Sequence, residues 1–134
     1  MNALLWILQA LLALMFLWHG WLFLAPPAEM AAQMNAFIPA WFRLFIGAAE
    51  VVAAIALIVP GLTRVQPKLT PAAAAGLMIV TFSASVLHLT RGETASAVTT
   101  AVLFLLLAVV AYGRWRVRPI APRSAAGAPA AVSR

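Results

Sequence analysis

The stretch ALLWILQALLALMFLWHGWLFL, residues 3–24, contains no Asp, Glu, Lys or Arg and decides the class of fold. A helix of this length spans roughly 33 Å, close to the thickness of the hydrocarbon core of a bilayer. No Lys or Arg precedes the stretch, and it is longer than the apolar part of a secretory signal peptide. We therefore expect an uncleaved first transmembrane helix.

Three further apolar stretches have the length of membrane spans. We expect helices over about residues 42–60, 70–89 and 95–113 in addition to 3–24. Prolines and glycines separate these stretches, and we expect Pro60-Gly61 to end the second helix. Hydrophobic residues make up 65% of the 134 positions, which excludes an ordinary soluble domain. The predicted fold is all-α, an integral membrane antiparallel four-helix bundle over residues 1–115.

The basic residues predict how the bundle lies in the membrane. Four spans place both termini on one side, together with the loop between the second and third helices. That side carries Arg64, Lys68, Arg114, Arg116, Arg118, Arg123 and Arg134, and the other side carries Arg43 and Arg91. Because basic residues concentrate on the cytoplasmic side of membrane proteins, we expect both termini in the cytoplasm.

Arg114, Arg116 and Arg118 form a basic cluster directly after the last predicted helix. The net charge of +6 and the pI of about 11.8 would suggest nucleic-acid binding in a soluble protein. Beside a membrane, however, topology and attraction to anionic lipid explain such a cluster. We therefore expect a lipid-facing cluster and no nucleic-acid partner. Residues 116–134 are rich in Ala, Pro, Ser and Gly, which predicts a disordered cytoplasmic tail.

The residue types limit the chemistry that the chain can carry out alone. It has no cysteine, so it forms no disulfide and binds no iron-sulfur cluster through thiolates. It has no Asp, no His-Glu-x-x-His pair and no glycine-rich phosphate loop. We expect no metal site and no covalently bound cofactor. A redox role would need a borrowed cofactor or partner, so the chain is not expected to be an enzyme on its own.

Glu50 is the only charged residue in the apolar run 44–59 and is the leading candidate for a functional residue. A charge at membrane depth costs at least about 2.5 kcal/mol, so it usually has a partner or a function. The i, i+4, i+7 spacing places Arg43, Gly47 and Glu50 on one helix face. Polar residues of the other helices would lie on the same side of the membrane. We expect a small polar cavity, open to the extracytoplasmic side, formed by Glu50, His88, Arg43, His19, Ser85 and Arg91.

Each of these residues also has a purely structural explanation. A buried Glu50 can accept hydrogen bonds and fix helix register, which we weigh evenly with ligand or proton chemistry. His88 and His19 lie near helix ends, where a histidine can bond interfacial water. Arg43 and Arg91 can anchor lipid phosphates. Only the predicted convergence of the group on one side of the membrane favours a functional site.

Several sequence blocks occur together in a characteristic order. They are WILQALLA at 6–13, Arg43-Leu44-x-x-Gly47-x-x-Glu50 followed by LIVPGLT at 57–63, LTPAAAAG at 69–76 and HLTRGE at 88–93. Through these blocks the chain resembles the DoxX-like family of small four-helix membrane proteins over about residues 4–115. The resemblance implies a four-helix bundle in a bacterial inner membrane, and it marks Glu50, His88 and Arg43.

The chain departs from the family pattern at two places. The family usually has a Lys shortly after the glycine near the end of the first helix, whereas Trp21 follows Gly20 here. The cation that would pair with Glu50 is therefore missing, and His19 is the expected substitute. Glycines that commonly follow the Glu appear as Ala53 and Ala56.

The resemblance implies three functional hypotheses. The family takes its name from a membrane subunit of a thiosulfate:quinone oxidoreductase, and similar proteins are linked to redox complexes, methylamine utilisation and membrane-protein assembly. The first hypothesis is an accessory subunit of a membrane oxidoreductase, with a quinone or a proton handled in the Glu/His/Arg pocket. The second is a non-catalytic scaffold or assembly factor for another membrane protein. A small-molecule transporter is less favoured, since paired broken helices are not evident. The oligomeric state stays open.

Overall fold

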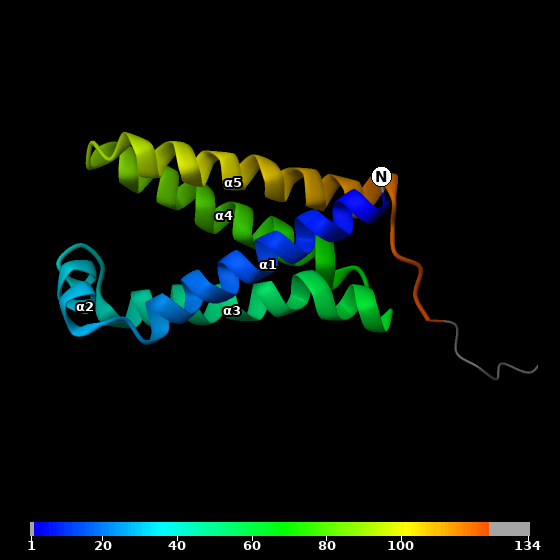
Figure 1. Cartoon of the computed structure of the whole chain (residues 1–134), viewed down its shortest axis with the longest axis horizontal. Coiled ribbons are helices and arrows are strands. Elements are labelled where there is room, and N and C mark those ends of the chain that lie inside the picture. The colour runs from blue at the N-terminus through cyan, green and yellow to red at the C-terminus, as the bar shows by residue number, and fades with distance from the viewer. Residues whose placement is uncertain (1, 124–134) are drawn as a thin grey trace, which may run out of the picture.

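The computed structural model describes residues 2–123, and every regular element in that range is helical (Figure 1). The elements are α1 (Asn2–Leu24), α2 (Ala28–Asn35), α3 (Ala40–Thr63), α4 (Leu69–Thr90), α5 (Thr94–Tyr112) and the π-helical turn η1 (Gly113–Val117). Four helices, α1, α3, α4 and α5 with η1, are long and apolar enough to cross a membrane. The predicted all-α four-helix bundle is confirmed.

The four long helices pack as two pairs. α1 packs along α3, α4 packs along α5, and α3 and α4 join the pairs, whereas α1 and α5 share few contacts. α1 runs diagonally, from the start of the chain beside the end of α5 to its own end beside α3 (Figure 1). We call the end of the bundle with the N-terminus and η1 the terminal end, and the opposite end the α2 end.

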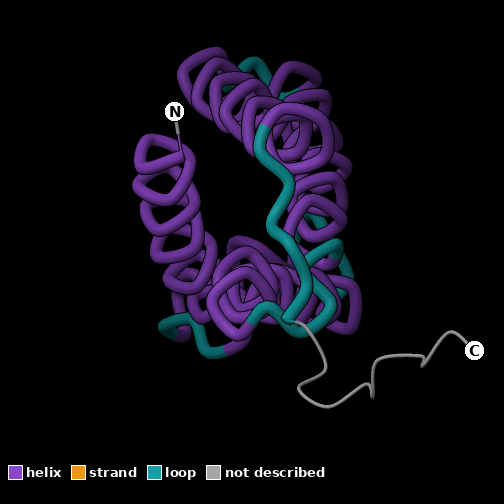
Figure 2. Tube along the Cα trace, turned by 90° about the vertical axis from the view of Figure 1, so that its right-hand side faces the viewer, coloured by secondary structure: helices purple, strands orange, loops and turns teal. Residues whose placement is uncertain are grey.

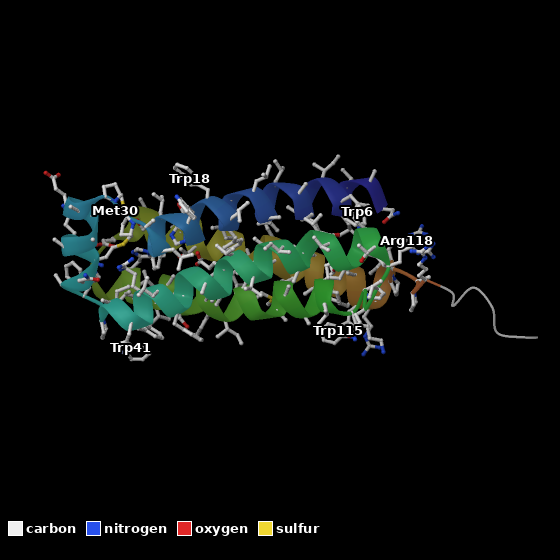
Figure 3. All side chains as sticks on the ribbon, turned by 90° about the horizontal axis from the view of Figure 1, so that it is seen from below. Trp6, Trp18, Met30, Trp41, Trp115 and Arg118 are labelled. Atoms are coloured by element: carbon white, nitrogen blue, oxygen red, sulfur yellow. The ribbon has the colours of Figure 1, made fainter. Side chains whose placement is uncertain are left out.

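The tryptophans lie toward the two ends of the bundle. Trp18 and Trp41 lie toward the α2 end, and Trp6 and Trp115 lie toward the terminal end (Figure 3). Trp18, Trp41 and Trp115 are largely exposed. Tryptophans prefer the two interfaces between membrane and water, so this distribution agrees with a bundle that spans the bilayer end to end.

The hydrophobic core combines residues of all four long helices. Leu57, Leu77, Leu107 and Val110 are fully buried there and come from α3, α4 and α5. α1 adds Leu12, Ala13 and Phe16 to the same cluster. Most of the remaining large apolar side chains are exposed, as expected when lipid covers the surface of the bundle.

The link between α1 and α3 contains a short helix, α2, that the sequence analysis did not predict. Its sequence, AEMAAQMN, consists mainly of strong helix formers, and Pro27 in an extended conformation (φ −54°, ψ 150°) starts it. No residue of α2 is buried. With eight residues, α2 is too short for its apolar periodicity to distinguish it from a loop.

Pro60 lies inside α3, so the expectation that Pro60-Gly61 ends the second span is wrong. A proline has no N–H, and the carbonyl four residues earlier, that of Ala56, loses its usual partner. The Thr70 hydroxyl on α4 donates to this carbonyl at 3.3 Å. The Gln9 amide on α1 donates to the next carbonyl, that of Leu57, at 2.6 Å. These bonds from neighbouring helices satisfy the carbonyls around the proline, and α3 continues to Thr63.

Removing the Thr70 hydroxyl should weaken the bundle, because it leaves the Ala56 carbonyl without this donor in a part-buried position. We expect Thr70→Val to lower the free energy of unfolding by about 1 kcal/mol. Thr99→Val is the matched control, since Thr99 is exposed and its hydroxyl bonds only the Ala95 carbonyl of its own helix. Denaturation of both variants in detergent micelles checks the prediction. Equal losses would show that the contact to α3 contributes nothing specific.

Candidate functional site

Glu50 lies inside the bundle and pairs with His19. It is 1% exposed, on the face of α3 that also carries the buried residues Arg43, Gly47, Ala54 and Leu57. Its Oε2 lies 2.7 Å from Nδ1 of His19 on α1. With Glu50 ionised, Nδ1 of His19 carries a proton and donates a hydrogen bond to the carboxylate. The contact joins α1 to α3 near the α2 end.

His19 connects this buried carboxylate to the surroundings of the bundle. Its side chain is 48% exposed, against 2% for the side chain of Glu50. Its ring packs against Phe23, with 4.6 Å between the ring centroids. Within residues 2–123, Nε2 of His19 makes no hydrogen bond, so this nitrogen is available to a ligand or to water. The pair therefore has one buried end and one accessible end.

A close crossing of two glycines holds α1 and α3 together beside this pair. A Cβ at Gly20 would lie 2.9 Å from the Gly47 carbonyl oxygen, and a Cβ at Gly47 would lie 2.9 Å from the Gly20 carbonyl oxygen. Real side chains do not approach backbone so closely, so only glycine fits at either position. Gly20 directly follows His19, and Gly47 lies one turn before Glu50. The crossing therefore sets the distance between the imidazole and the carboxylate.

Arg43 lies on the same face of α3 as Glu50 but is bonded elsewhere. Its guanidinium donates to the backbone carbonyl of Phe23 at the end of α1 and, at 3.2 Å, to Oδ1 of Asn35 at the end of α2. Arg43 is buried, and within the described residues it makes no ion pair. These bonds connect the last residues of α1 and α2 to the start of α3. Arg43 lies seven residues, about two helical turns, before Glu50.

His88 and Arg91 form a second cluster, which does not include Glu50. Nδ1 of His88 lies 2.5 Å from Oε2 of Glu93, and the Arg91 guanidinium lies 2.7 Å from Oε1 of the same carboxylate. Gly92, with φ at +72°, makes the sharp turn that brings Glu93 back to His88. The Arg91 guanidinium also stacks on Phe37, 3.6 Å from the ring centroid. The structure thus pairs His88 with Glu93 and not with the residues of the single polar cavity that the sequence analysis expected.

Ser85 bonds a third partner. Its hydroxyl lies 2.7 Å from the Thr100 hydroxyl and links α4 to α5. The six predicted site residues therefore lie toward the same end of the bundle, but they divide among separate sets of partners. Among the six, only Glu50 and His19 are joined by a hydrogen bond between their side chains.

The grooves on the bundle surface differ from the polar cavity that the sequence predicts. One groove of about 600 Å³ is lined by Leu14, Leu17, Trp18, Trp21, Leu24 and Val51. A second, of about 350 Å³, shares Leu14 and Leu17 and continues along α1 and α3 past Ala10, Ala54 and Ile58. Both are apolar, and neither is lined by Glu50 or His19. Among residues 2–123, no three His, Cys, Asp or Glu side chains gather as a metal site would require.

Arg114 does not belong to a lipid-facing cluster. It is 3% exposed, whereas Arg116 and Arg118 are exposed as expected. In η1 the Arg118 N–H bonds the carbonyl of Gly113 five residues earlier, at 2.7 Å. Arg114 lies four residues after Val110 and seven after Leu107, on the buried face of the helix, and its Nε donates to Oε1 of Gln9 at 2.5 Å.

Sequence reasoning missed several residues that hold the site region together. Glu93 is part of the sequence block at 88–93, but its contact with His88 was not predicted, because it depends on the turn at Gly92. Asn35 and Phe37 lie in the link between α1 and α3, for which the sequence analysis made no prediction, and both contact arginines from other elements. Residues 116–123 were assigned to a disordered tail, yet they complete η1 and pack along the terminal end. Residues 124–134 of that tail lie outside the described part.

Fold and site together define a four-span α-helical membrane protein with a buried carboxylate–histidine pair. The chain belongs to the DoxX-like family, whose model matches residues 7–111. No curated protein and no solved structure matches the chain. The resemblance inferred from the sequence blocks is confirmed.

Proposed function

We propose that this DoxX-like protein is an accessory subunit of a membrane-bound oxidoreductase and that His19 with Glu50 handles protons at a quinone headgroup. The observation that supports this is the difference in exposure between the two side chains, since a buried carboxylate lies behind a half-exposed imidazole. A carboxylate hydrogen-bonded to one ring nitrogen orients a histidine and stabilises its protonated form. The free Nε2 is then the group that meets a substrate.

The chemistry of quinone reduction fits such a pair. A quinone takes up two electrons and two protons to give the quinol, and this chain contains no cysteine or metal site in its described residues to supply the electrons. The electrons would come from the redox partner. The protonated Nε2 of His19 would give a proton to a ring oxygen, leaving a neutral imidazole bonded to Glu50. Water at the α2 end would reprotonate His19 before the second transfer.

The proposed orientation places both termini in the cytoplasm of a bacterial inner membrane. The terminal end carries Arg64, Lys68, Arg114, Arg116, Arg118 and Arg123, and the α2 end carries Arg43 and Arg91. This imbalance supports a cytoplasmic terminal end. His19 and Glu50 would then exchange protons with the extracytoplasmic side.

A non-catalytic scaffold or assembly factor is the second candidate function. The observation that favours it is the continuous apolar groove along α1 and α3, with small residues such as Ala10 and Ala54 on its walls. Small residues let a partner helix approach closely within a membrane. In this alternative, the His19–Glu50 pair fixes the packing of α1 on α3 and transfers no proton.

Purification of the chain in mild detergent tests the first candidate. We expect quinone in the organic extract and an oxidoreductase subunit in the purified complex. Glu50→Gln keeps the volume of the side chain but removes its charge, and it should lower the quinone content while the partner stays bound. Glu93→Gln is the matched control, because it alters the other carboxylate–histidine pair. A partner that is not an oxidoreductase, with no quinone, would support the scaffold instead.

A further inference from the structure

Arg114 is buried far from every side-chain carboxylate of the protein. The sequence contains three acidic residues, Glu29, Glu50 and Glu93. Glu29 lies on α2, Glu50 lies on α3, and Glu93 lies in the turn between α4 and α5. All three are toward the α2 end of the bundle. Arg114 lies in η1 at the terminal end and is 3% exposed. A buried guanidinium without an opposite charge is costly, so its surroundings indicate what the position is for.

The partners of Arg114 in the described residues are all neutral. Nε donates to Oε1 of Gln9 at 2.5 Å, and Nη1 donates to Oδ1 of Asn2 at 2.7 Å and to the carbonyl of Arg118 at 3.5 Å. Nη2 is buried and has no hydrogen-bond partner within residues 2–123. The Trp6 ring lies alongside, 4.8 Å from the guanidinium carbon. The guanidinium is thus held firmly in place while its charge and one nitrogen remain unmatched.

Residues 118–123 form a strap that covers this region. After η1 the strap crosses the terminal end of the bundle toward α3, as Figure 2 shows in teal. Arg64 at the end of α3 holds it, through Nε to the Ala121 carbonyl at 3.0 Å and through its own carbonyl to the Arg123 N–H at 2.9 Å. The Ile120 side chain packs against Gly61, where an added Cβ would lie 2.8 Å from it. Most other strap residues are exposed, so few contacts resist its displacement.

We propose that Arg114 is the binding site for the phosphate group of an anionic phospholipid, which reaches the guanidinium when the strap lifts. A guanidinium presents paired donors that match two phosphate oxygens, and the unpartnered Nη2 supplies one of them. Arg114 lies where the last span ends, beside the exposed Trp115, which is the depth of lipid headgroups.

Native mass spectrometry of the full chain, with equal amounts of phosphatidylglycerol and phosphatidylcholine in detergent, tests the proposal. We expect one phosphatidylglycerol to be retained saturably per chain. Arg114→Gln should lower this retention about tenfold or more, because it removes charge-assisted bonds to the phosphate. Arg116→Gln, which removes an exposed charge of the same element, should leave retention nearly unchanged. Equal losses in the two variants would overturn the proposal in favour of general surface attraction.

Two further arms separate the source of the phosphate and the role of the strap. Excess inorganic phosphate should not displace the lipid, and full displacement would mean that Arg114 binds a free anion instead. Ile120→Ala keeps Arg114 but loosens the strap, so it should increase phosphatidylglycerol retention. No increase would overturn access through the strap, even if Arg114→Gln failed to fold. A protein bound in place of the lipid would likewise contradict the proposal.

Discussion

Gly47→Ala is expected to lower the free energy of unfolding by about 1–3 kcal/mol, as overpacking of a tight contact does. The added methyl group would lie 2.9 Å from the Gly20 carbonyl oxygen and 2.9 Å from Cβ of Phe23. Neither atom can move alone, because one belongs to the backbone of α1 and the other is fixed directly to it. α1 and α3 must therefore separate, and the 2.7 Å contact between His19 and Glu50 must lengthen.

Gly76→Ala is the matched control for this prediction. Gly76 also lies within a long helix, but no atom lies within 4 Å of the position that its Cβ would take. Alanine is the better helix former by up to about 1 kcal/mol, so this variant should be neutral or more stable. Unfolding of both variants by SDS in mixed micelles, followed by circular dichroism, provides the comparison. Similar stabilities of the two variants would mean that the glycine crossing does not hold the bundle together.

Glu50→Gln is expected to abolish proton transfer while the bundle stays folded. Glutamine can still bond Nδ1 of His19, but it no longer stabilises the protonated imidazole. A positioned general acid contributes about 10²–10⁴-fold to a rate, so quinone reduction in the purified complex should slow by at least about 10²-fold. His19→Gln should have a similar effect, and the double variant should lose little more, because the two residues act as a unit.

Glu50→Ala separates the functional from the structural explanation of the same residue. Alanine removes the partner of His19 and leaves space between α1 and α3, so we expect this variant to be less stable than Glu50→Gln. If Glu50→Gln kept the full rate of its partner enzyme while Glu50→Ala unfolded, the pair would be structural and the scaffold function would be favoured.

The spans could be predicted from the sequence because their length and hydropathy are local properties. The end of α3 could not, since Pro60 is tolerated only through donors from Thr70 and Gln9 on other helices. α2 was not predicted because its eight residues are too few for a periodic pattern to identify a helix.

The candidate site was only partly predictable. Helix periodicity placed Glu50 on the buried face of α3, and the departure from the family pattern at Trp21 indicated His19 as its partner. His19 meets Glu50 because Gly20 and Gly47 allow α1 and α3 to cross closely. His88 instead bonds Glu93, which the turn at Gly92 returns to within 2.5 Å.

Arg114 was predicted to face lipid, but it is buried. In an Arg-Trp-Arg-Val-Arg run next to a span, every arginine reads as lipid-facing. Arg114 instead continues the buried face of Leu107 and Val110 and bonds Gln9 and Asn2, whereas Arg116 and Arg118 lie outside. The sequence does not indicate these partners, because they lie more than 100 residues earlier in the chain.

Redox-induced infrared difference spectroscopy of the purified membrane complex tests the central claim most directly. Reducing the bound quinone should change the protonation or hydrogen bonding of the Glu50 carboxyl group, and the resulting carboxyl band should disappear in Glu50→Gln. The same band should persist in Glu93→Gln, which changes the contacts with His88 and Arg91 but not those of Glu50. A spectrum without a carboxyl band, or one that Glu50→Gln leaves unchanged, would contradict a role for the His19–Glu50 pair in proton transfer.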